Sequence, residues 1–266
     1  MKKIGAVFTA VILVTALSLV TGCGSKNDKL LCGVTVYEPM DYKNPDGTWT
    51  GFDADFARLV GGKIGMKVEF VEINWDSKYM ELQSGAINCI WNGFTANDTD
   101  DDGVKRSDKV DFSYSYMLNE QCVVVKAANA ASYTDVSDLT GKTAAAEKGS
   151  SGEGVATDSV GETGKVISSD SQIATFIEVK SGAVDCAVVD ILLAKSLIGT
   201  GSYSDLAIAD IAMPSEVYAV GFKKGSPLRD KVNAAIKELY DDGSLADLAA
   251  KYGLENSLLV DTSFTG

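Results

Sequence analysis

Strand-like and helix-like patterns alternate along most of this chain, and that alternation limits the folds open to it more than any other feature. Residues 30–37, 67–73 and 87–91 are apolar runs typical of strands. Residues 53–64 and 76–84 separate them and carry helix signals, with apolar side chains every four positions in the first and Gly85 closing the second. This order predicts a mostly parallel sheet with helices on its faces.

The alternation restarts after Val125 and predicts a second α/β unit. The expected strands are residues 142–146, 184–189 and 217–222, and the expected helices are residues 171–181, 191–198, 226–242 and 244–252. Asp53 is expected to cap the first helix of the chain, and Ser226 to cap the long helix near its end, with Pro227 in the first turn. We find no convincing internal repeat and no low-complexity linker.

The first 25 residues have the layout of an export signal. Lys2 and Lys3 precede an apolar run over residues 4–20, and small residues then lead to Cys23. A cysteine at the cleavage point predicts a lipoprotein signal peptide over residues 1–22, a lipidated Cys23 and a polar tether over residues 23–28. The alternative is a transmembrane helix, although the run is at the lower limit of length for one. We therefore expect an extracytoplasmic protein, lipid-anchored to the cell membrane.

Charge and composition exclude several classes of function. The formal net charge of −13 argues against nucleic acid and other polyanionic partners. The chain has no histidine, which removes Ser-His-Asp and Cys-His catalysis and His-ligated zinc. It has no P-loop motif, so it supplies no ATP chemistry of its own.

The cysteines beyond Cys23 are widely spaced and lie in apolar, strand-like runs, at positions Cys32, Cys89, Cys122 and Cys186. Without a CxxC pair, metal ligation is not indicated. An even number of cysteines outside the cell permits two disulfides, but the apolar context favours four small buried thiols.

Several segments in a fixed order carry a resemblance to a known family. They are Gly51-Phe52-Asp53-Ala54-Asp55, Gln83-Ser84-Gly85-Ala86-Ile87-Asn88, Trp91-Asn92-Gly93-Phe94-Thr95, Val110-Asp111-Phe112-Ser113, Gly149-Ser150-Ser151, Val184-Asp185-Cys186-Ala187-Val188-Val189-Asp190 and Lys224-Gly225-Ser226-Pro227-Leu228-Arg229. Over residues 30–255 the chain resembles the extracellular solute-binding proteins of polar amino-acid ABC transporters, family 3.

The resemblance implies an α/β, two-lobe periplasmic-binding-protein-like fold of type II, with two crossover strands and a ligand cleft between the lobes. The crossings would fall near residues 120–126 and 216–222. Lobe 1 would comprise residues 29–119 plus 220–257, lobe 2 residues 120–219, and residues 258–266 would form a C-terminal tail.

The implied function is non-catalytic. The protein would close on a polar amino acid outside the membrane and deliver it to an ABC-transporter permease driven by a separate ATPase. We expect a monomer with no cofactor. Two alternatives stay open: a dehydratase on the same scaffold, with Glu147 as general acid, and a ligand-sensing module.

The resemblance and the charge of a free amino acid together suggest the binding residues. A carboxylate and an ammonium can be buried together only if each is paired. Arg106 stands six residues before Phe112, where the family has its carboxylate-binding arginine, with Thr95, Ser150 and Ser151 as further donors. Asp190, at the end of a strand, would hold the ammonium, helped by the Gly93 carbonyl.

The remaining pocket wall would decide which amino acid fits. The resemblance places Tyr37, Trp75, Asn92 and Glu147 there. Glu147 is an unusual residue at its position and would favour a cationic or amide side chain. Val34, in contrast, stands where members that bind basic ligands often have an acid.

An acidic insertion over residues 97–104 separates Arg106 from Thr95 by eleven positions, a wider gap than the family has. Either the insertion loops out and Arg106 keeps its place, or the arginine is displaced. Asp98, Asp100 and Asp102 alternate before Gly103 like the start of a calcium loop, but position twelve holds Lys109 in place of glutamate. A solvated acidic loop is therefore favoured over a calcium site.

Overall fold

The computed structural model describes residues 28–264. The predicted signal peptide over residues 1–22, the lipidation site Cys23 and most of the predicted tether lie outside these residues. Within the described part of the chain, no helix combines the length and apolarity needed to cross a membrane.

A long central sheet runs through the molecule in the order β4-β1-β5-β11-β6-β9-β7-β8. Its strands are β1 (Lys29–Val34), β4 (Lys67–Glu72), β5 (Cys89–Ile90), β6 (Asp111–Lys126), β7 (Thr143–Glu147), β8 (Lys165–Ser169), β9 (Cys186–Asp190) and β11 (Ser215–Phe222). Strand β1 is parallel to both β4 and β5, and β7 is parallel to both β8 and β9. The two parallel groups confirm the α/β fold class that the alternating patterns predict.

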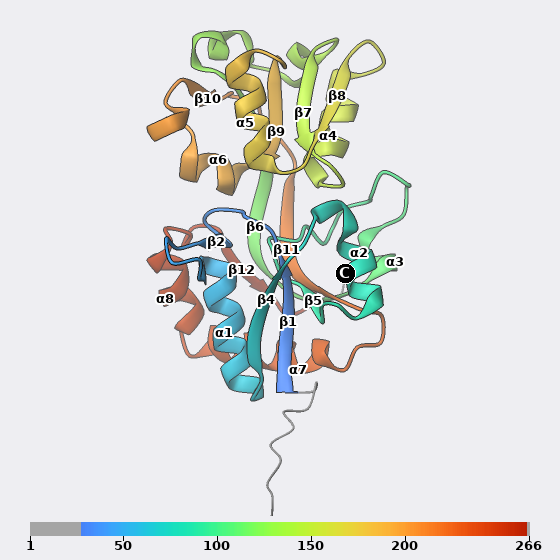
Figure 1. Ribbon diagram of the computed structural model, residues 1–266, viewed down its shortest axis with the longest axis vertical. Coiled ribbons are helices and arrows are strands. Elements are labelled where there is room, and N and C mark those ends of the chain that lie inside the picture. Colours follow the sequence, from blue (N-terminus) through green and yellow to red (C-terminus); the bar gives the residue numbers. More distant parts are fainter. Residues whose placement is uncertain (1–27, 265–266) are drawn as a thin grey trace, which may run out of the picture.

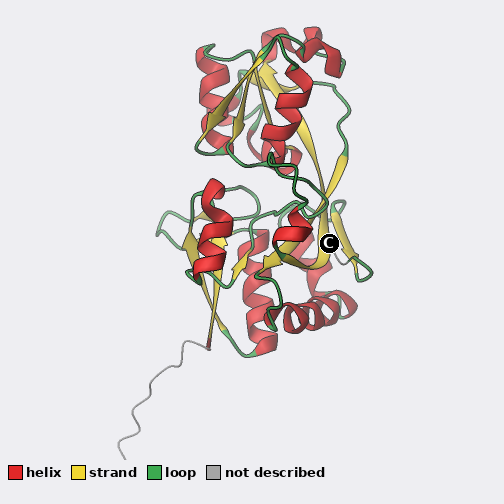
Figure 2. Ribbon diagram, turned by 90° about the vertical axis from the view of Figure 1, so that its right-hand side faces the viewer, coloured by secondary structure: helices red, strands yellow, loops and turns green. Residues whose placement is uncertain are grey.

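The helices gather around the two ends of this sheet and form two lobes (Figures 1 and 2). The first lobe holds α1 (Phe52–Ile64), α2 (Lys78–Ser84), α3 (Arg106–Lys109), α7 (Leu228–Asp241) and α8 (Ser244–Lys251). The second holds α4 (Ser151–Val160), α5 (Gln172–Ser181) and α6 (Ile191–Leu197). Four short strands complete the fold: β2 (Tyr42–Lys43), β3 (Trp49–Thr50), β10 (Leu206–Ile208) and β12 (Leu258–Asp261).

Strands β6 and β11 are the only long elements that run between the lobes in Figure 1. They pair antiparallel, from Ser215 opposite Glu120 to Phe222 opposite Asp111. Strand β6 has 16 residues and begins well before the crossing expected near residue 120, because it continues through the sheet of the first lobe. The lobes are therefore connected by one pair of strands, β6 and β11.

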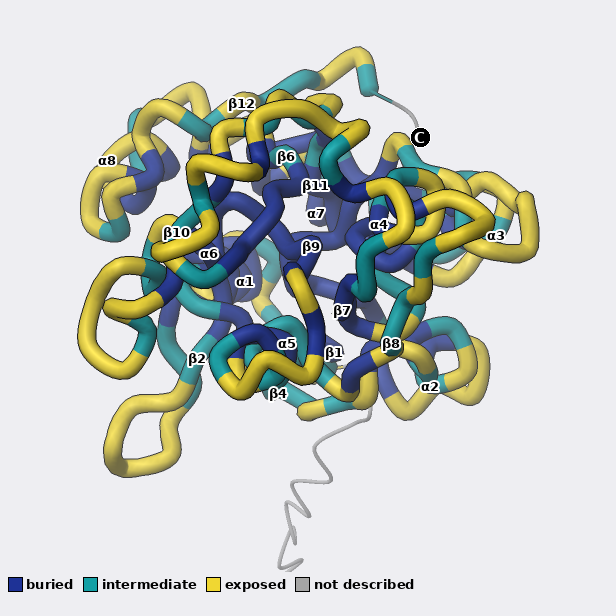
Figure 3. Tube along the Cα trace, turned by 90° about the horizontal axis from the view of Figure 1, so that it is seen from above, coloured by how far each residue is buried: buried dark blue, intermediate teal, exposed yellow. Residues whose placement is uncertain are grey.

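Apolar side chains on both faces of the sheet form the core, which Figure 3 shows as buried strands within an exposed outer ring of loops. Trp91 packs edge-on against Phe56, and Phe52 stacks on Tyr116. The four cysteines that the structure describes are buried free thiols. The Sγ atoms of Cys32 and Cys89, on neighbouring strands, lie 3.6 Å apart.

Two predicted helix caps are corrected. Gly51, not Asp53, precedes α1, with φ +114°, and a Cβ there would lie 2.2 Å from the Met40 carbonyl oxygen. Asp53 is inside the helix and buried, because its carboxylate accepts hydrogen bonds from the Gly93 N–H and the Tyr116 hydroxyl. Pro227 occupies the N-cap position of α7, one residue after the expected Ser226.

Candidate functional site

A small cavity of about 10 Å³ lies between the lobes. Its lining residues are Trp75, Asn92, Gly93, Thr95, Arg106, Glu147, Ser150, Ser151, Gln172 and Asp190. The cavity thus brings together nine of the ten side chains proposed from the sequence, and it adds Gln172.

The lining follows from where the strands end. Asn92, Gly93 and Thr95 lie two to five residues after the end of β5, and Arg106 begins α3 on the same lobe. Opposite them, Glu147 ends β7 and Asp190 ends β9, while Ser151 and Gln172 begin α4 and α5. Because the carboxyl ends of parallel strands meet at one edge of a sheet, polar residues distant in sequence converge there.

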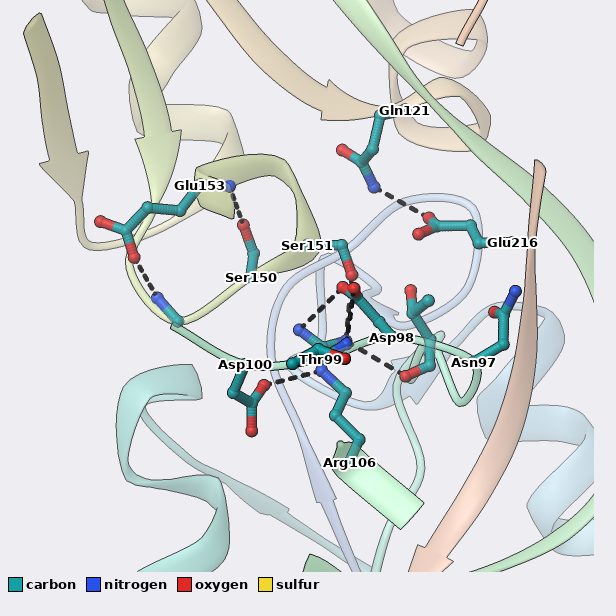
Figure 4. A network of polar contacts seen from close by, with 12 residues as sticks. Asn97, Asp98, Thr99, Asp100, Arg106, Gln121, Ser150, Ser151, Glu153 and Glu216 are labelled. Carbon is teal, nitrogen blue, oxygen red and sulfur yellow. Dashed lines mark hydrogen bonds and ion pairs between the residues drawn. The ribbon is translucent and has the colours of Figure 1, made fainter. Parts of the chain in front are cut away.

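Arg106 is the buried cation of the cavity, with 2% of its surface exposed. Its Nη1 donates to the Thr95 carbonyl oxygen at 3.1 Å and to the Ser151 hydroxyl of the other lobe at 3.0 Å. Its Nε donates to Asp100 at 2.8 Å, and Asp98 lies 3.6 Å from Nη2 (Figure 4). Burial alone would lower the pKa of Arg106, but Asp98 and Asp100 raise it, so the guanidinium stays charged.

The acidic insertion therefore loops out and leaves Arg106 in the cavity wall. Burial alone would raise the pKa of Asp100, but Arg106 and Lys109 hold it at about 2. Lys109 also pairs with Asp102 at 2.8 Å. The aspartates of the calcium-like pattern thus face the protein's own cations, and the described residues include no group of three or more acidic or Cys side chains suited to a metal.

The start of α4 presents further donors to the cavity. The Ser150 hydroxyl accepts the Glu153 N–H at 3.2 Å and caps the helix. Gly149, at φ +71°, donates its N–H to the Glu153 carboxylate at 2.7 Å. Ser150 and Ser151 line the cavity, so the first turn of α4 lies against it with its positive end.

Asp190 has the position of an N-cap before α6, but its side chain makes no capping bond. Its Oδ1 instead accepts from the amides of Asn119 and Gln121, both at 2.7 Å. Its Oδ2 accepts from the Gln172 amide, and the Asp190 N–H donates to Gln172 Oε1 at 2.9 Å. Gln172 could have been suspected from its place directly after Ser171, the N-cap of α5, because a polar residue there faces the same sheet edge.

Glu147 is the second acid of the cavity and is 5% exposed. Burial, with a smaller effect of Asp190, raises its pKa to about 8, although Lys78 and Gln172 oppose the shift. Glu147 is therefore mostly protonated near neutral pH.

Lys78 was not expected at the site. Its Nζ lies against the rings of Trp75 and Tyr79 and donates to the Gly149 carbonyl oxygen of the other lobe at 2.9 Å. Burial, followed by the charge of Arg106, lowers its pKa to about 8. A lysine within α2 gives no local signal of this contact, because Gly149 is 71 residues away in sequence.

Two expected wall residues have their polar groups directed elsewhere. Tyr37 does not line the cavity, because its hydroxyl lies 2.6 Å from that of Tyr218 and the two rings stand edge to face behind Gly93. Asn92 lines the cavity, but its amide is tied to Thr35, accepting the backbone N–H at 2.7 Å and donating to the hydroxyl at 2.8 Å. Asn92 thus fixes the loop more than it offers a free amide.

The cavity consequently combines positive and acidic groups. Its lining includes a buried guanidinium, the N-terminus of α4 and two buried carboxyl groups. A small molecule with a carboxylate and one or more cationic groups would have each charge paired.

Comparison with known sequences identifies one family. The sequence profile of the bacterial extracellular solute-binding proteins, family 3, matches residues 30–255. The arginine-binding extracellular protein ArtP of Bacillus subtilis (strain 168) is 28% identical over 262 residues, which cover 95% of this chain and 98% of that protein.

Solved structures with the same fold include an ancestral arginine-binding protein bound to glutamine. It has a TM-score of 0.77 and 31% identity, covering 85% of this chain and 97% of that one. The ancestral amino-acid-binding protein AncCDT-1, a precursor of cyclohexadienyl dehydratase, has a TM-score of 0.74 and 29% identity, covering 85% and 96%.

Proposed function

The chain belongs to the bacterial extracellular solute-binding proteins of family 3, and we propose that it binds an amino acid with a cationic or amide side chain for an ABC transporter. One observation carries the choice of ligand. One interlobe cavity is lined by buried Arg106 from the first lobe and by two buried carboxyl groups, Asp190 and Glu147, from the second.

The charges of the cavity explain this choice. Arg106 would pair with the α-carboxylate of the ligand and Asp190 with its α-ammonium. Glu147 then remains for the ligand side chain, and in its protonated form it can also face an amide. ArtP is an arginine-binding protein, and the ancestral structure holds glutamine, so both kinds of side chain occur among proteins similar to this chain.

Closure of the lobes would trap the ligand. In this proposal lobe 1 comprises residues 29–119 plus 220–257 and lobe 2 residues 120–219. Two hydrogen bonds join the lobes, one from Arg106 to Ser151 and one from Lys78 to Gly149. Ligand contacts made from both lobes favour this closed arrangement over an open one.

The proposed location of the protein in the cell rests on its family and on the predicted lipoprotein signal over residues 1–22. A lipidated Cys23 would tether the protein at the outer face of the membrane as a monomer, next to a permease driven by a separate ATPase. The acylated end of the chain would supply the anchor.

A cavity carboxyl that is protonated near neutral pH also has the property of a general acid, as a dehydratase would need. AncCDT-1 is a binding protein and a precursor of such an enzyme. Binding without catalysis is the better-supported function, because Arg106 and Asp190 together match the two charges of a free amino acid.

Thermal unfolding of the purified protein with each of the twenty amino acids and L-cystine tests the proposal. We expect the largest stabilisation with L-arginine, L-lysine or L-glutamine, since stabilisation grows with ligand concentration over Kd. Arg106→Ala and Asp190→Asn should abolish it. Arg229→Ala, which removes an exposed arginine paired with Asp230, should leave it intact.

Absence of stabilisation by every amino acid would overturn the proposal. Equal losses in Arg106→Ala and Arg229→Ala would show that the effect comes from net charge and not from the cavity.

A further inference from the structure

A second buried carboxyl group lies behind Asp190. Glu216 is on the crossing strand β11, is 8% exposed, and does not line the cavity. Asp190 itself is 7% exposed. The ammonium-binding residue proposed above is therefore one half of a pair of acids.

The pair is held by two amides from the other crossing strand. Asn119 Nδ2 donates to Asp190 Oδ1 at 2.7 Å and also to Glu216 Oε1. Gln121 Nε2 donates to the same two oxygens, at 2.7 and 2.8 Å. Figure 4 shows Gln121 directed at Glu216. Because both amides bridge the same two oxygen atoms, the carboxyl groups are held close together.

Among the described residues, no cation is one of the main groups that act on Glu216. The groups that face Glu216 are Asp190 on β9, the neutral amides of Asn119 and Gln121 on β6, and the hydroxyls of Tyr37 and Tyr218. Glu147 on β7 faces Asp190 from the cavity side. Two neighbouring buried carboxyl groups without a cation do not both ionise readily.

The electrostatics agree with this geometry. Burial, and next the charge of Asp190, raise the pKa of Glu216 to about 8, against the hydrogen bonds from Asn119 and Gln121. Protonated Glu216 lies within hydrogen-bonding reach of Asp190.

We propose that Glu216 is a positioning residue that shares a proton with Asp190 in the ligand-free protein and releases that proton when an ammonium group binds Asp190. This inference rests on the proposed function. The step is a simple ionisation: the O–H bond of Glu216 breaks, the proton goes to the solvent, and the ammonium keeps all of its protons.

The Asp190–Glu216 pair lies where the proposed ligand site meets the two strands that connect the lobes. Asn119 and Gln121 belong to β6 and Glu216 to β11, so both strands that join the lobes contact the acid pair. Binding of an ammonium at Asp190 would therefore change the charge at the strand pair that connects the lobes.

The sign of the pH dependence follows from the direction of proton transfer. A ligand cation lowers the pKa of Glu216, so binding releases a proton and becomes tighter as pH rises. The affinity should increase by up to about tenfold per pH unit from about pH 6 to about pH 8, and level off above.

The first experiment needs no ligand. In protein labelled with ¹³C at the glutamate carboxyl carbons, two signals should titrate near pH 8; the signal of Glu216 should be absent from Glu216→Gln, and that of Glu147 should remain. Glutamine keeps an acceptor oxygen for Asn119 and Gln121 and can donate to Asp190, so this variant should fold. If the signal lost in Glu216→Gln titrates near the ordinary glutamate value, about 4.3, the inference is wrong.

The second experiment is calorimetric titration with L-arginine and L-glutamine at several pH values, in buffers of different ionisation enthalpy. The natural protein should release a proton on binding. Near pH 6, Glu216→Gln should bind the ligand with the same affinity as the natural protein. Above pH 6, it should lack part of the rise in affinity. Glu147→Gln should keep the part of that rise that depends on Glu216.

Glu120→Gln is the matched control, because it removes a carboxyl group from β6 next to the network without entering it. It should leave both the titration and the proton release unchanged. If the Glu216 signal titrates near pH 8 but no amino acid binds, the acid pair exists and the proposed function fails. If amino acids bind with the same pH dependence in the natural protein and in Glu216→Gln, the coupling is wrong and the proposed function stands.

Discussion

Arg106 donates its Nε–H to Oδ1 of Asp100 across 2.8 Å, so a residue of the acidic insertion holds the only buried arginine of the described chain. Asp100 also accepts from Lys109 and from the Tyr79 hydroxyl, which leaves it little freedom to move. From the sequence, the insertion could have displaced Arg106 from the pocket. In the structure it instead holds the guanidinium in place through Asp100, on the side away from Ser151.

Replacement of Asp100 by asparagine should weaken both the fold and the site. The buried guanidinium would lose its closest negative charge, and we expect a loss of about 2–3 kcal/mol in the free energy of unfolding and about tenfold in ligand affinity. Urea denaturation and calorimetry measure the two. Asp102→Asn, which weakens the pair of a mostly exposed carboxylate with Lys109 and keeps an acceptor oxygen for the Val104 N–H, should cost less than about 1 kcal/mol. Equal effects of both substitutions would contradict a special role of Asp100.

Calcium should not stabilise the protein. Asp98 and Asp100 face Arg106, and Asp100 and Asp102 face Lys109, so a calcium ion would have to replace existing ion pairs. The midpoint of thermal unfolding should be the same with millimolar calcium chloride and with a chelator. A clear rise with calcium that disappears in Asp102→Asn would restore the calcium-loop interpretation of the sequence.

Stability should fall as pH rises, because of a second pair of buried acids in the first lobe. Burial raises the pKa of Asp53 to about 7, and burial together with Asp53 raises that of Asp41, whose carboxylate oxygens have no hydrogen-bond partner. The folded chain thus holds protons that the unfolded chain has lost above its carboxyl pKa. This stability is fully present below about pH 4 and is lost as pH rises through about 7.

Asp41→Asn isolates the effect of that pair. Between about pH 5 and about pH 8 the natural protein should lose about 1–3 kcal/mol more than the variant in the free energy of unfolding, measured with urea. Glu147 and Glu216 act in the same direction in both proteins, so the difference between them reports on Asp41 and Asp53. Parallel pH profiles would show that the pair carries no excess proton.

Gly93→Ala should damage the cavity wall. Gly93 has φ +56°, and a Cβ would lie 2.5 Å from Tyr37 Cε1 and 2.9 Å from Tyr218 Cε2, in rings that are fixed by their hydroxyl contact. We expect a loss of about 2–4 kcal/mol in the free energy of unfolding and weaker ligand binding. Gly85→Ala has a similar φ of +78° with open space around it, and should cost only about 1 kcal/mol. Comparable losses would mean that backbone strain alone, and not the tyrosine contact, sets the cost.

Local signals predicted the parts of this protein that depend on local sequence. The alternating patterns predicted β1, β4, β5, β7 and β9, but not β8 (Lys165–Ser169). Through the family resemblance, the segments ending in Thr95, Ser151 and Asp190 indicated polar residues that the sheet edge brings together. The family resemblance, and not a local signal, indicated Arg106 through its distance from Phe112, and the structure places it in the cavity wall.

Contacts between distant segments were decided by the tertiary structure alone. Asp53 satisfies the sequence rule for a cap, yet it is buried in the helix because Gly93 and Tyr116 supply donors from 40 and 63 residues away. Lys78 contacts Gly149, 71 residues away. Asn119 bonds to Asp190 and to Glu216, which are 71 and 97 residues away. No periodicity or cap signal reports such pairs, because the free energy of a buried charge depends on the groups that the fold brings around it.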